Sequence, residues 1–157
     1  MKTNEVPRVN TPQGGWIGEM PGPFLSACTE PLVEGAPDLR GTWRAVEVTM
    51  DGAPAPDGLP LWNHVERIEQ AGSRAIVTSD GIIHDFVAVD GTFENGCIDV
   101  AAIDKTTPIV VAATYEDGVF TLRPRDMEDV VVRRWREGDR LGWDYNGYFR
   151  MMLERID

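Results

Sequence analysis

From Asp38 onward, short runs of aliphatic, β-branched and aromatic residues alternate with polar dipeptides typical of tight turns. Gly, Asn and Asp dominate these dipeptides because hairpin turns need positive φ angles, which those residues tolerate best. No stretch of about twelve residues has apolar positions at helical spacing. The turn dipeptides are Ala71-Gly72, Asp80-Gly81, Asp90-Gly91, Asn95-Gly96, Asp117-Gly118, Gly138-Asp139 and Asn146-Gly147. The runs between them predict about ten strands, at residues 42–49, 63–70, 73–79, 82–94, 97–103, 108–115, 119–123, 129–136, 140–145 and 148–156, with a bulge at Asp90-Gly91 in the fourth.

The predicted strands follow one another along the chain with few long connections, which is typical of an antiparallel meander. A meander of about eight to ten strands is expected to close on itself, because closure removes unpaired edges that would otherwise aggregate. A two-sheet sandwich would need long cross-connections, and these are missing. The sequence therefore predicts an all-β fold, an up-and-down antiparallel β-barrel of about 8–10 strands.

The long connection over residues 50–62 is a candidate lid over one end of the barrel. Its three prolines stiffen it, and Leu59, Leu61 and Trp62 are available to cover an opening. Loops of this length in a compact domain are often functional. We therefore place Trp62 at the opening of the barrel. The neighbouring His64 is either a portal residue or a solvated loop histidine.

Residues 1–38 differ in texture from the rest of the chain. They hold six of the eleven prolines and five glycines, and they show no sustained strand or helix period. Apolar residues nevertheless recur between Trp16 and Val33, which a purely disordered tail would not need. We interpret residues 1–38 as an extended N-terminal arm that packs on a barrel domain of residues 39–157, with one helical turn around residues 23–28. A flexible leader is the alternative.

The hairpin at Asp80-Gly81 predicts buried residues on both sides of its strands. A two-residue turn sets Val77 opposite His84 and Ala75 opposite Phe86, with small residues facing large ones. The other face is also mostly apolar and consists of Ile76, Thr78, Ile83, Asp85, Val87 and Val89. An ordinary barrel strand exposes one of its faces to solvent. We therefore expect the arm to cover the outer face of the two strands of this hairpin.

Aromatic residues of the later strands are further candidates for the interior wall. By the period of two, Trp143 shares a face with Tyr145, and Arg133 shares a face with Trp135. Aromatic rings with a polar tip suit a pocket that stacks a flat ligand, and Arg133 could pair with a carboxylated one. The alternatives are cross-strand pairs that only stabilise the sheet and a solvated charged face. The predicted ligand-binding residues are Trp62, His64, His84, Phe86, Tyr115, Arg133, Trp135, Trp143 and Tyr145.

The two histidines are the candidate acid–base groups. If the protein is an enzyme, His84 would transfer protons and Tyr115 would donate a hydrogen bond. A core histidine without a catalytic role is the alternative. A carboxylate partner for His84 must come from another strand, because Asp85 faces the opposite side. The spacing of His64 and His84 makes a poor metal site, so we expect no metal and no cofactor.

The start of the first predicted strand, Gly41-x-Trp43, followed by a long loop and a hairpin meander, resembles the lipocalin and related calycin barrels. In that superfamily the tryptophan packs across the closed end of the barrel, and an arginine near the end of the last strand stacks on it. The resemblance implies this structural role for Gly41, Trp43 and Arg155, with Arg150 as the second choice for the arginine. It implies a lipocalin-like barrel over residues 38–157. The glycine-rich Tyr-Pro motif of the haem-binding nitrobindins is missing, so no haem is implied.

The charge balance argues against polyanionic partners. The chain of 157 residues holds 15 Lys+Arg and 26 Asp+Glu, a formal net charge of −11. Nucleic acids and anionic membranes are bound by basic surfaces, so we expect neither as a partner. The alternative is that the acidic surface only keeps the protein soluble. No apolar run suits a signal peptide or a membrane span, and Cys28 and Cys97 lack redox or metal spacing, which favours a cytoplasmic protein with unpaired thiols.

These features together predict a carrier or sensor that binds a small hydrophobic or aromatic molecule inside the barrel. The alternative is a cofactor-independent enzyme that uses the same cavity for acid–base isomerisation, cyclisation or hydration of a hydrophobic metabolite. The sequence has no nucleophile elbow, phosphate loop or dinucleotide fingerprint. A third hypothesis is an interaction module whose cavity is packed shut. Both a monomer and a homodimer are compatible with the sequence.

Overall fold

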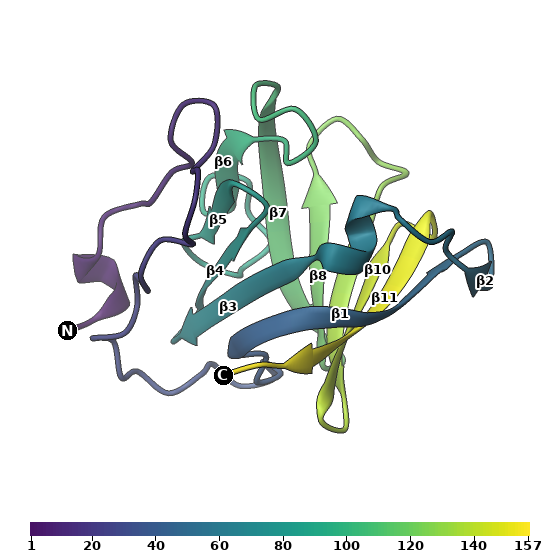
Figure 1. Ribbon diagram of the computed structural model, residues 1–157. Helices are drawn as coiled ribbons and strands as arrows, with labels where there is room; N and C mark the ends of the chain where they lie inside the picture. The colour runs from purple at the N-terminus through teal and green to yellow at the C-terminus, as the bar shows by residue number, and fades with distance from the viewer.

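Ten antiparallel strands wind into a nearly closed barrel in the computed structural model, which describes residues 1–157 (Figure 1). The barrel strands are β1 (Gly41–Met50), β3 (Val65–Ala71), β4 (Arg74–Ser79), β5 (Ile82–Phe86), β6 (Cys97–Val100), β7 (Pro108–Glu116), β8 (Val119–Pro124), β9 (Val132–Glu137), β10 (Arg140–Tyr145) and β11 (Phe149–Arg155). The remaining elements are the short strand β2 (Ala53–Pro54) and the 3-10 helices η1 (Thr3–Glu5) and η2 (Pro60–Asn63). Neither helix approaches the length or apolarity needed to cross a bilayer.

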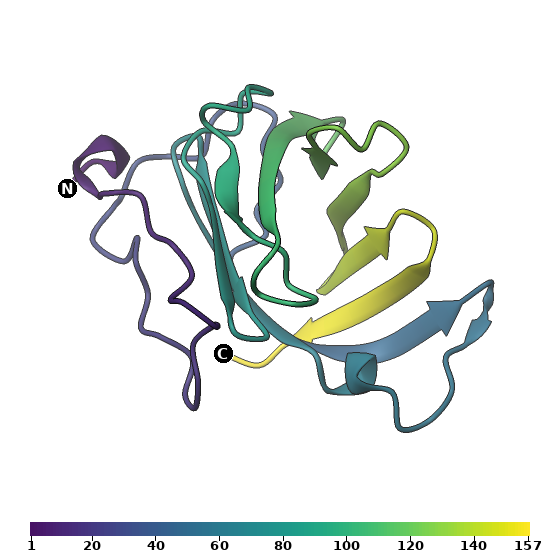
Figure 2. The ribbon, with the colours of Figure 1, turned by 90° about the horizontal axis from the view of Figure 1, so that it is seen from above.

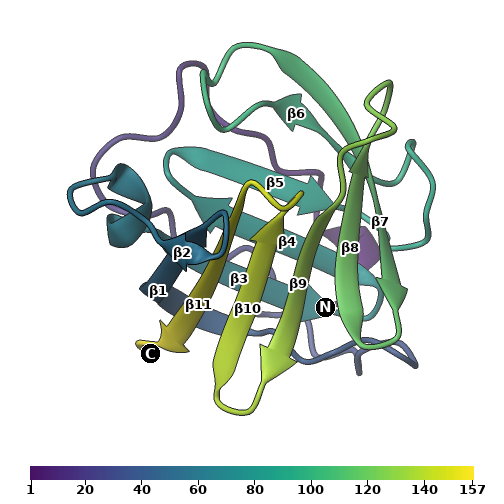
Figure 3. The ribbon, with the colours of Figure 1, turned by 90° about the vertical axis from the view of Figure 1, so that its right-hand side faces the viewer.

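The strands follow the order β5-β4-β3-β1-β11-β10-β9-β8-β7-β6 around the barrel. Each strand is hydrogen-bonded to its neighbours in this order, so β5 and β6 are the two ends of the sheet. Seen from above, the sheet curves into a ring that brings these two ends together (Figure 2). Figure 3 shows β9, β10 and β11 side by side on the opposite wall. The predicted all-β, lipocalin-like barrel is therefore confirmed.

Tight turns at predicted Asp-Gly and Asn-Gly dipeptides set the register of the hairpins. Asp80, Asp117 and Asn146 have φ angles of 45°, 51° and 52°, and each is followed by a glycine that also has positive φ. Two consecutive residues of positive φ match the twist of the flanking strands. The turn at Asp80 sets Val77 opposite His84, in the predicted register.

The predicted strand over residues 82–94 ends early, at Phe86. Beyond its end, the carboxylate of Asp90 accepts hydrogen bonds from the backbone N–H and the hydroxyl of Thr92 and so closes a local turn. The chain then bends, and Val89 packs into the interior core. The prediction that Val89 lies on the outer face was therefore wrong.

Trp43 fills the closed end of the barrel. Its side chain is fully buried, and its indole Nε1 donates to the carbonyl of Leu39 at 3.0 Å. The guanidinium carbon of Arg155 lies 4.9 Å from the ring centroid, and that of Arg136 lies 5.5 Å from it. A Cβ at Gly41 would come within 2.8 Å of Arg155 Nε, so the close approach of this arginine requires glycine there. This is the arrangement that the resemblance to lipocalins implies.

The N-terminal segment lies along the outer face of β3, β4 and β5 (Figure 1). Leu25 is buried there against Ile76 and Ile83, and five partly buried side chains pack around these three. Those five are Val6, Val9, Trp16, Phe24 and Cys28. The segment around residues 23–28 is a turn in which Cys28 N donates to the carbonyl of Leu25. Cys28 and Cys97 are both unpaired.

A buried ion pair anchors this segment to the barrel. Arg74 Nη2 and Asp85 Oδ2 lie 2.6 Å apart, and each side chain exposes 1% of its surface. Arg74 also donates to the carbonyls of Thr3, Val6 and Pro7. Two buried charges need such additional hydrogen bonds to offset their desolvation. The division of the chain into a separate arm of residues 1–38 and a barrel domain stays a prediction.

Candidate ligand site at the mouth of the barrel

Four ionisable side chains form a hydrogen-bonded cluster where residues 51–64 and the β4–β5 turn meet. We call this end of the barrel the mouth. Arg134 of β9 reaches Glu66 of β3, and its Nε and Nη2 donate to the two carboxylate oxygens at 2.8 and 3.2 Å. His64 contacts Glu66 through Nε2 and Asp80 through Nδ1, at 2.7 Å each. Glu66 is fully buried and His64 exposes only 3% of its side chain. These four residues are the mouth cluster.

Opposite charges hold the mouth cluster in its ionised form. Burial alone would raise the pKa of Glu66, but the charge of Arg134 and the hydrogen bond from His64 outweigh it and lower that pKa to about 2. Burial alone would lower the pKa of His64, but the hydrogen bonds to Asp80 and Glu66 outweigh it and raise that pKa to about 9. At neutral pH two carboxylates and two cations are therefore present, and their formal charges cancel.

His64 should make the stability of the protein depend on pH in the alkaline range. Its pKa is about 9 in the folded protein and about 6.5 in an unfolded chain. Its contribution, about 3 kcal/mol, is therefore fully present below pH ~6.5 and lost as the pH rises through ~9. In urea unfolding between about pH 6 and 10, the wild type should lose stability more steeply than His64→Gln, while His84→Gln keeps the wild-type slope. Parallel curves for the wild type and His64→Gln would contradict this role.

Trp143 of β10 covers the mouth cluster from the apolar side. Its ring lies 4.6 Å from the guanidinium carbon of Arg134 and 4.7 Å from the ring of His64. The indole Nε1–H of Trp143 is buried without a hydrogen-bond partner. Arg134 uses Nε and Nη2 in the mouth cluster, and its Nη1 makes no hydrogen bond within the protein but is not sealed from solvent. Because an unpaired donor in the interior costs free energy, the site suits a molecule that supplies a hydrogen-bond acceptor.

His84 lies on the inward face of β5, opposite Val77 and near Phe86. Its Nε2 is 2.8 Å from the backbone carbonyl oxygen of Val100. A carbonyl only accepts, so Nε2 carries the hydrogen and Nδ1 has a free lone pair. Burial lowers the pKa of His84, which keeps the ring neutral at pH ~7. The negative charge of Asp99 opposes that shift, although the Asp99 carboxylate makes no hydrogen bond to the His84 ring.

The two candidate tyrosines lie apart from the mouth cluster. The hydroxyl of Tyr115 accepts a hydrogen bond from Gln70 Nε2 at 2.9 Å, near the closed end of the barrel. Tyr145 lies at the rim of the mouth, is 39% exposed, and stacks on Phe149 with 5.3 Å between ring centroids. The structure therefore does not bring either tyrosine to His64.

Arg133 and Trp135 point away from the interior, so the prediction that they line it was wrong. Arg133 is exposed on the outer face of β9. Trp135 packs on the same outer face, where a Cβ at Gly142 would overlap its ring. The guanidinium carbon of Arg150 lies 5.3 Å from the Trp135 ring centroid and covers it from solvent.

The mouth cluster contains residues that sequence reasoning missed or misplaced. The sequence pattern assigns neither Arg134 nor Glu66 to the site. His64 is buried, so its alternative placement in a solvated loop was wrong. One signal could have found Arg134. A two-residue turn at Gly138-Asp139 sets it opposite Trp143, which the strand period had placed in a predicted pocket wall.

The long connection of residues 50–62 lies next to the mouth. Its Leu59, Leu61 and Trp62 are partly buried and pack against the interior core. The indole N–H of Trp62 donates to the carbonyl of Pro56 at 3.1 Å, so a hydrogen bond within the loop stabilises its conformation. A role for this loop as a lid stays a prediction.

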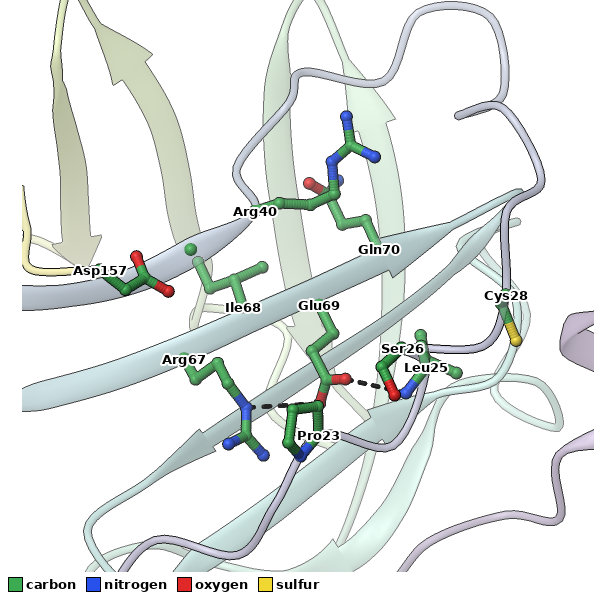
Figure 4. A pocket seen from close by; sticks show the side chains of 11 residues that line it. Pro23, Leu25, Ser26, Cys28, Arg40, Arg67, Ile68, Glu69, Gln70 and Asp157 are labelled. Carbon is green, nitrogen blue, oxygen red and sulfur yellow. Dashed lines mark hydrogen bonds and ion pairs between the residues drawn. The ribbon is translucent and has the colours of Figure 1, made fainter.

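Large apolar side chains occupy the interior of the barrel. Two pockets lie on its outside. The largest fully buried apolar side chains of the interior are Trp43, Phe86, Phe120, Leu39, Ile68, Leu141, Met151, Leu153 and Val48. One pocket, of about 280 Å³, lies between the N-terminal segment and β3, where Arg67 and Glu69 face Pro23 (Figure 4). The other, of about 360 Å³, lies at the rim beside Asp144 and Arg150.

The comparison with solved structures agrees with the observed topology. Human cRBP IV, a cellular retinol-binding protein, matches with a TM-score of 0.55 and 16% sequence identity, over 76% of this chain and 98% of its own. No protein-family model and no curated protein matches the sequence. The structural likeness shows that the chain has a calycin-type, lipocalin-like barrel fold. No group of three or more His, Cys, Asp or Glu is arranged to hold a metal ion.

Proposed function

We propose that the barrel binds a small hydrophobic or aromatic molecule at the mouth end of its interior, as a cytoplasmic carrier or sensor. The observation that carries this proposal is the buried indole N–H of Trp143, which has no hydrogen-bond partner and lies beside Arg134 on the adjacent strand, whose Nη1 is not used in the mouth cluster. An apolar wall with a few convergent polar groups is typical of ligand sites. The fold likeness to a retinol-binding protein supports the same class of function.

The charges of the mouth cluster favour a neutral acceptor over a carboxylate. Arg134 is already paired with Glu66, and Asp80 adds a second negative charge. A ligand carboxylate would bring a third negative charge to two buried cations, which is unfavourable in a medium of low dielectric constant. A carbonyl, ether or hydroxyl oxygen would accept from the unused N–H groups and leave the balance unchanged.

Two pairs of probes test this proposal by isothermal titration calorimetry. Each pair sets a neutral acceptor against a carboxylate: methyl 2-naphthoate against 2-naphthoate, and retinol against retinoic acid. We expect at least one neutral probe to bind with a Kd in the micromolar range and about tenfold more tightly than its acid. Arg134→Gln should weaken that binding by about tenfold, because the donor and the partner of Glu66 are lost.

Arg133→Gln is the matched control, because Arg133 is the same residue type one position away on the outer face of β9. We expect it to bind the neutral probe within about twofold of the wild type. Equal weakening by both substitutions would contradict a site on the inward face. The absence of binding by every probe below about 1 mM would contradict the proposed function.

An enzyme that uses the same interior is the second candidate, and the state of His84 favours it. Its neutral ring and free Nδ1 are what a general base needs. Such an enzyme would transfer a proton within a hydrophobic substrate, as in isomerisation, cyclisation or hydration. His84→Gln separates the two candidates, because it should leave binding of a neutral probe intact and abolish any turnover of a bound substrate.

A further inference from the structure

The barrel wall has a seam between β5 and β6. These strands are the two ends of the sheet and share no hydrogen-bonded ladder. One side-chain bond crosses between them, from His84 Nε2 to the carbonyl of Val100. His84 is only partly buried, whereas its inward-facing neighbours Ile82 and Phe86 expose 2% and 1% of their surfaces. The seam is therefore the place where the barrel wall lacks a hydrogen-bonded ladder.

The N-terminal residues Arg8–Thr11 close this seam from outside. On the β5 side, Thr11 Oγ1 accepts from Ile83 N at 2.8 Å and donates to Ile83 O at 3.2 Å. Val9 N donates to Asp85 Oδ2 at 2.9 Å. These three bonds, each made through a side chain, attach residues 8–11 along the free edge of β5.

The same four residues are also bonded to β6 and the residues before it. Thr11 N donates to Asp99 Oδ2 at 2.9 Å. Arg8 reaches the carbonyls of Gly96 and Glu94 through Nη1 and Nη2, at 2.7 and 3.1 Å. Residues 8–11 therefore bridge the two free edges of the sheet. Figure 1 shows this N-terminal part of the chain beside β5 and β6.

The closing segment is held mainly by hydrogen bonds and little by burial. None of residues 8–11 is buried, and only Val9 among them packs against the apolar cluster on β4 and β5, whereas Leu25 further along is 4% exposed and is one of its three buried members. Gly14, Gly15 and Gly18 have positive φ and separate the two parts. Segments with few buried apolar contacts open at low free-energy cost. Residues 8–11 can therefore lift while Thr3, Val6 and Pro7 stay bonded to Arg74 and the part around Leu25 stays docked.

We propose that residues Arg8–Thr11 are a removable seal over the β5–β6 seam, and that a ligand enters the barrel beside His84 when this seal lifts. The proposal rests on the proposed function, because it names the route to the same interior. It assigns to the N-terminal segment the control of access to the barrel. Its effect is on the rates of binding and release and not on affinity, since the seal does not touch the mouth cluster.

A labelling experiment without ligand tests whether the seal covers His84. Diethyl pyrocarbonate modifies neutral imidazole, and His64 and His84 are the only histidines, so peptide mass spectrometry assigns each site. Arg8→Gln/Thr11→Val removes the Arg8 bonds to Gly96 and Glu94 and the Thr11 hydroxyl bonds to Ile83, and we expect it to raise the labelling rate of His84 by about fivefold or more. His64 should be unaffected. Thr11→Val alone is the gentler variant if the double variant does not fold.

A stopped-flow experiment with the tightest-binding neutral probe tests the route itself. In Arg8→Gln/Thr11→Val, the association and dissociation rates should each rise by about fivefold, with Kd unchanged within about twofold. The matched control is Thr49→Val/Arg150→Gln, which removes the same residue types from β1 and β11 on the opposite wall. We expect this control to keep the wild-type rates.

The outcomes separate failure of the route from failure of the proposed function. Wild-type labelling of His84 in the seal variants would overturn the seal. Faster labelling with unchanged binding rates would overturn the route, because the seam would then open without admitting the probe. If no probe binds the wild type, the proposed function fails and the route fails with it, while the labelling result still decides whether residues 8–11 cover the seam.

Discussion

Replacing Glu66 with alanine is expected to lower the free energy of unfolding by about 3–5 kcal/mol. Glu66 is fully buried and accepts hydrogen bonds from both Arg134 and His64. Its removal leaves two cations in the interior that face only Asp80 at the rim. An uncompensated buried charge is among the few causes of so large an effect from one substitution. Urea unfolding at pH ~7 measures it.

Glu116→Ala is the matched control for this prediction. Glu116 pairs with Arg123 at 2.9 Å, but both side chains are nearly half exposed. An exposed pair contributes between about 0 and 1 kcal/mol, so this control should change the stability little. Equal effects of the two substitutions would show that the mouth cluster contributes no more to the free energy of unfolding than a surface ion pair does.

Deleting residues 1–35 is expected to lower the melting temperature by about 10 °C or more. The deletion uncovers Ile76 and Ile83 and removes the backbone carbonyls that bind the buried Arg74. In a domain of this size each kcal/mol lost corresponds to roughly 2–4 °C, and both an apolar surface and a buried ion pair are affected. Differential scanning calorimetry measures the change.

Two point substitutions in the same segment serve as its controls. Leu25→Ala should cost about 2–4 kcal/mol, because Leu25 is buried on β4 and β5. Ile17→Ala should cost almost nothing, because Ile17 is 93% exposed. An unchanged melting temperature after the deletion would contradict the interpretation of residues 1–38 as an arm packed on the barrel.

The fold could be predicted because its tight turns are determined by dipeptides that can be recognised in the sequence. Asp80-Gly81 and Asn146-Gly147 need positive φ, and each fixes the register of one hairpin. The early end of β5 at Phe86 was not predicted, although Asp90-Gly91 is one of the turn dipeptides. Beyond the end of the strand, the carboxylate of Asp90 accepts a hydrogen bond from Thr92 and closes a local turn.

The candidate site was harder to predict because its polar residues disturb the strand pattern. In β9 the face that carries Arg133 and Trp135 looked more like a pocket wall than the face that carries Arg134. A shift of one residue moves every side chain of a strand to the other face. In β3, Glu66 and Gln70 both face inward, so the alternation of apolar and polar residues gives no signal there. Only the ion pair between Glu66 and Arg134, 68 residues apart, makes an inward glutamate tolerable.

Native mass spectrometry of the protein purified from its own host tests the central claim most directly. If the barrel is a binder of small hydrophobic molecules, the wild-type spectrum should contain the chain together with a neutral molecule of a few hundred daltons. Organic extraction should release that molecule, and it should lack a carboxylate. A spectrum of the bare chain alone, together with no binding of retinol or methyl 2-naphthoate, would contradict the claim and favour a barrel packed shut around its own side chains.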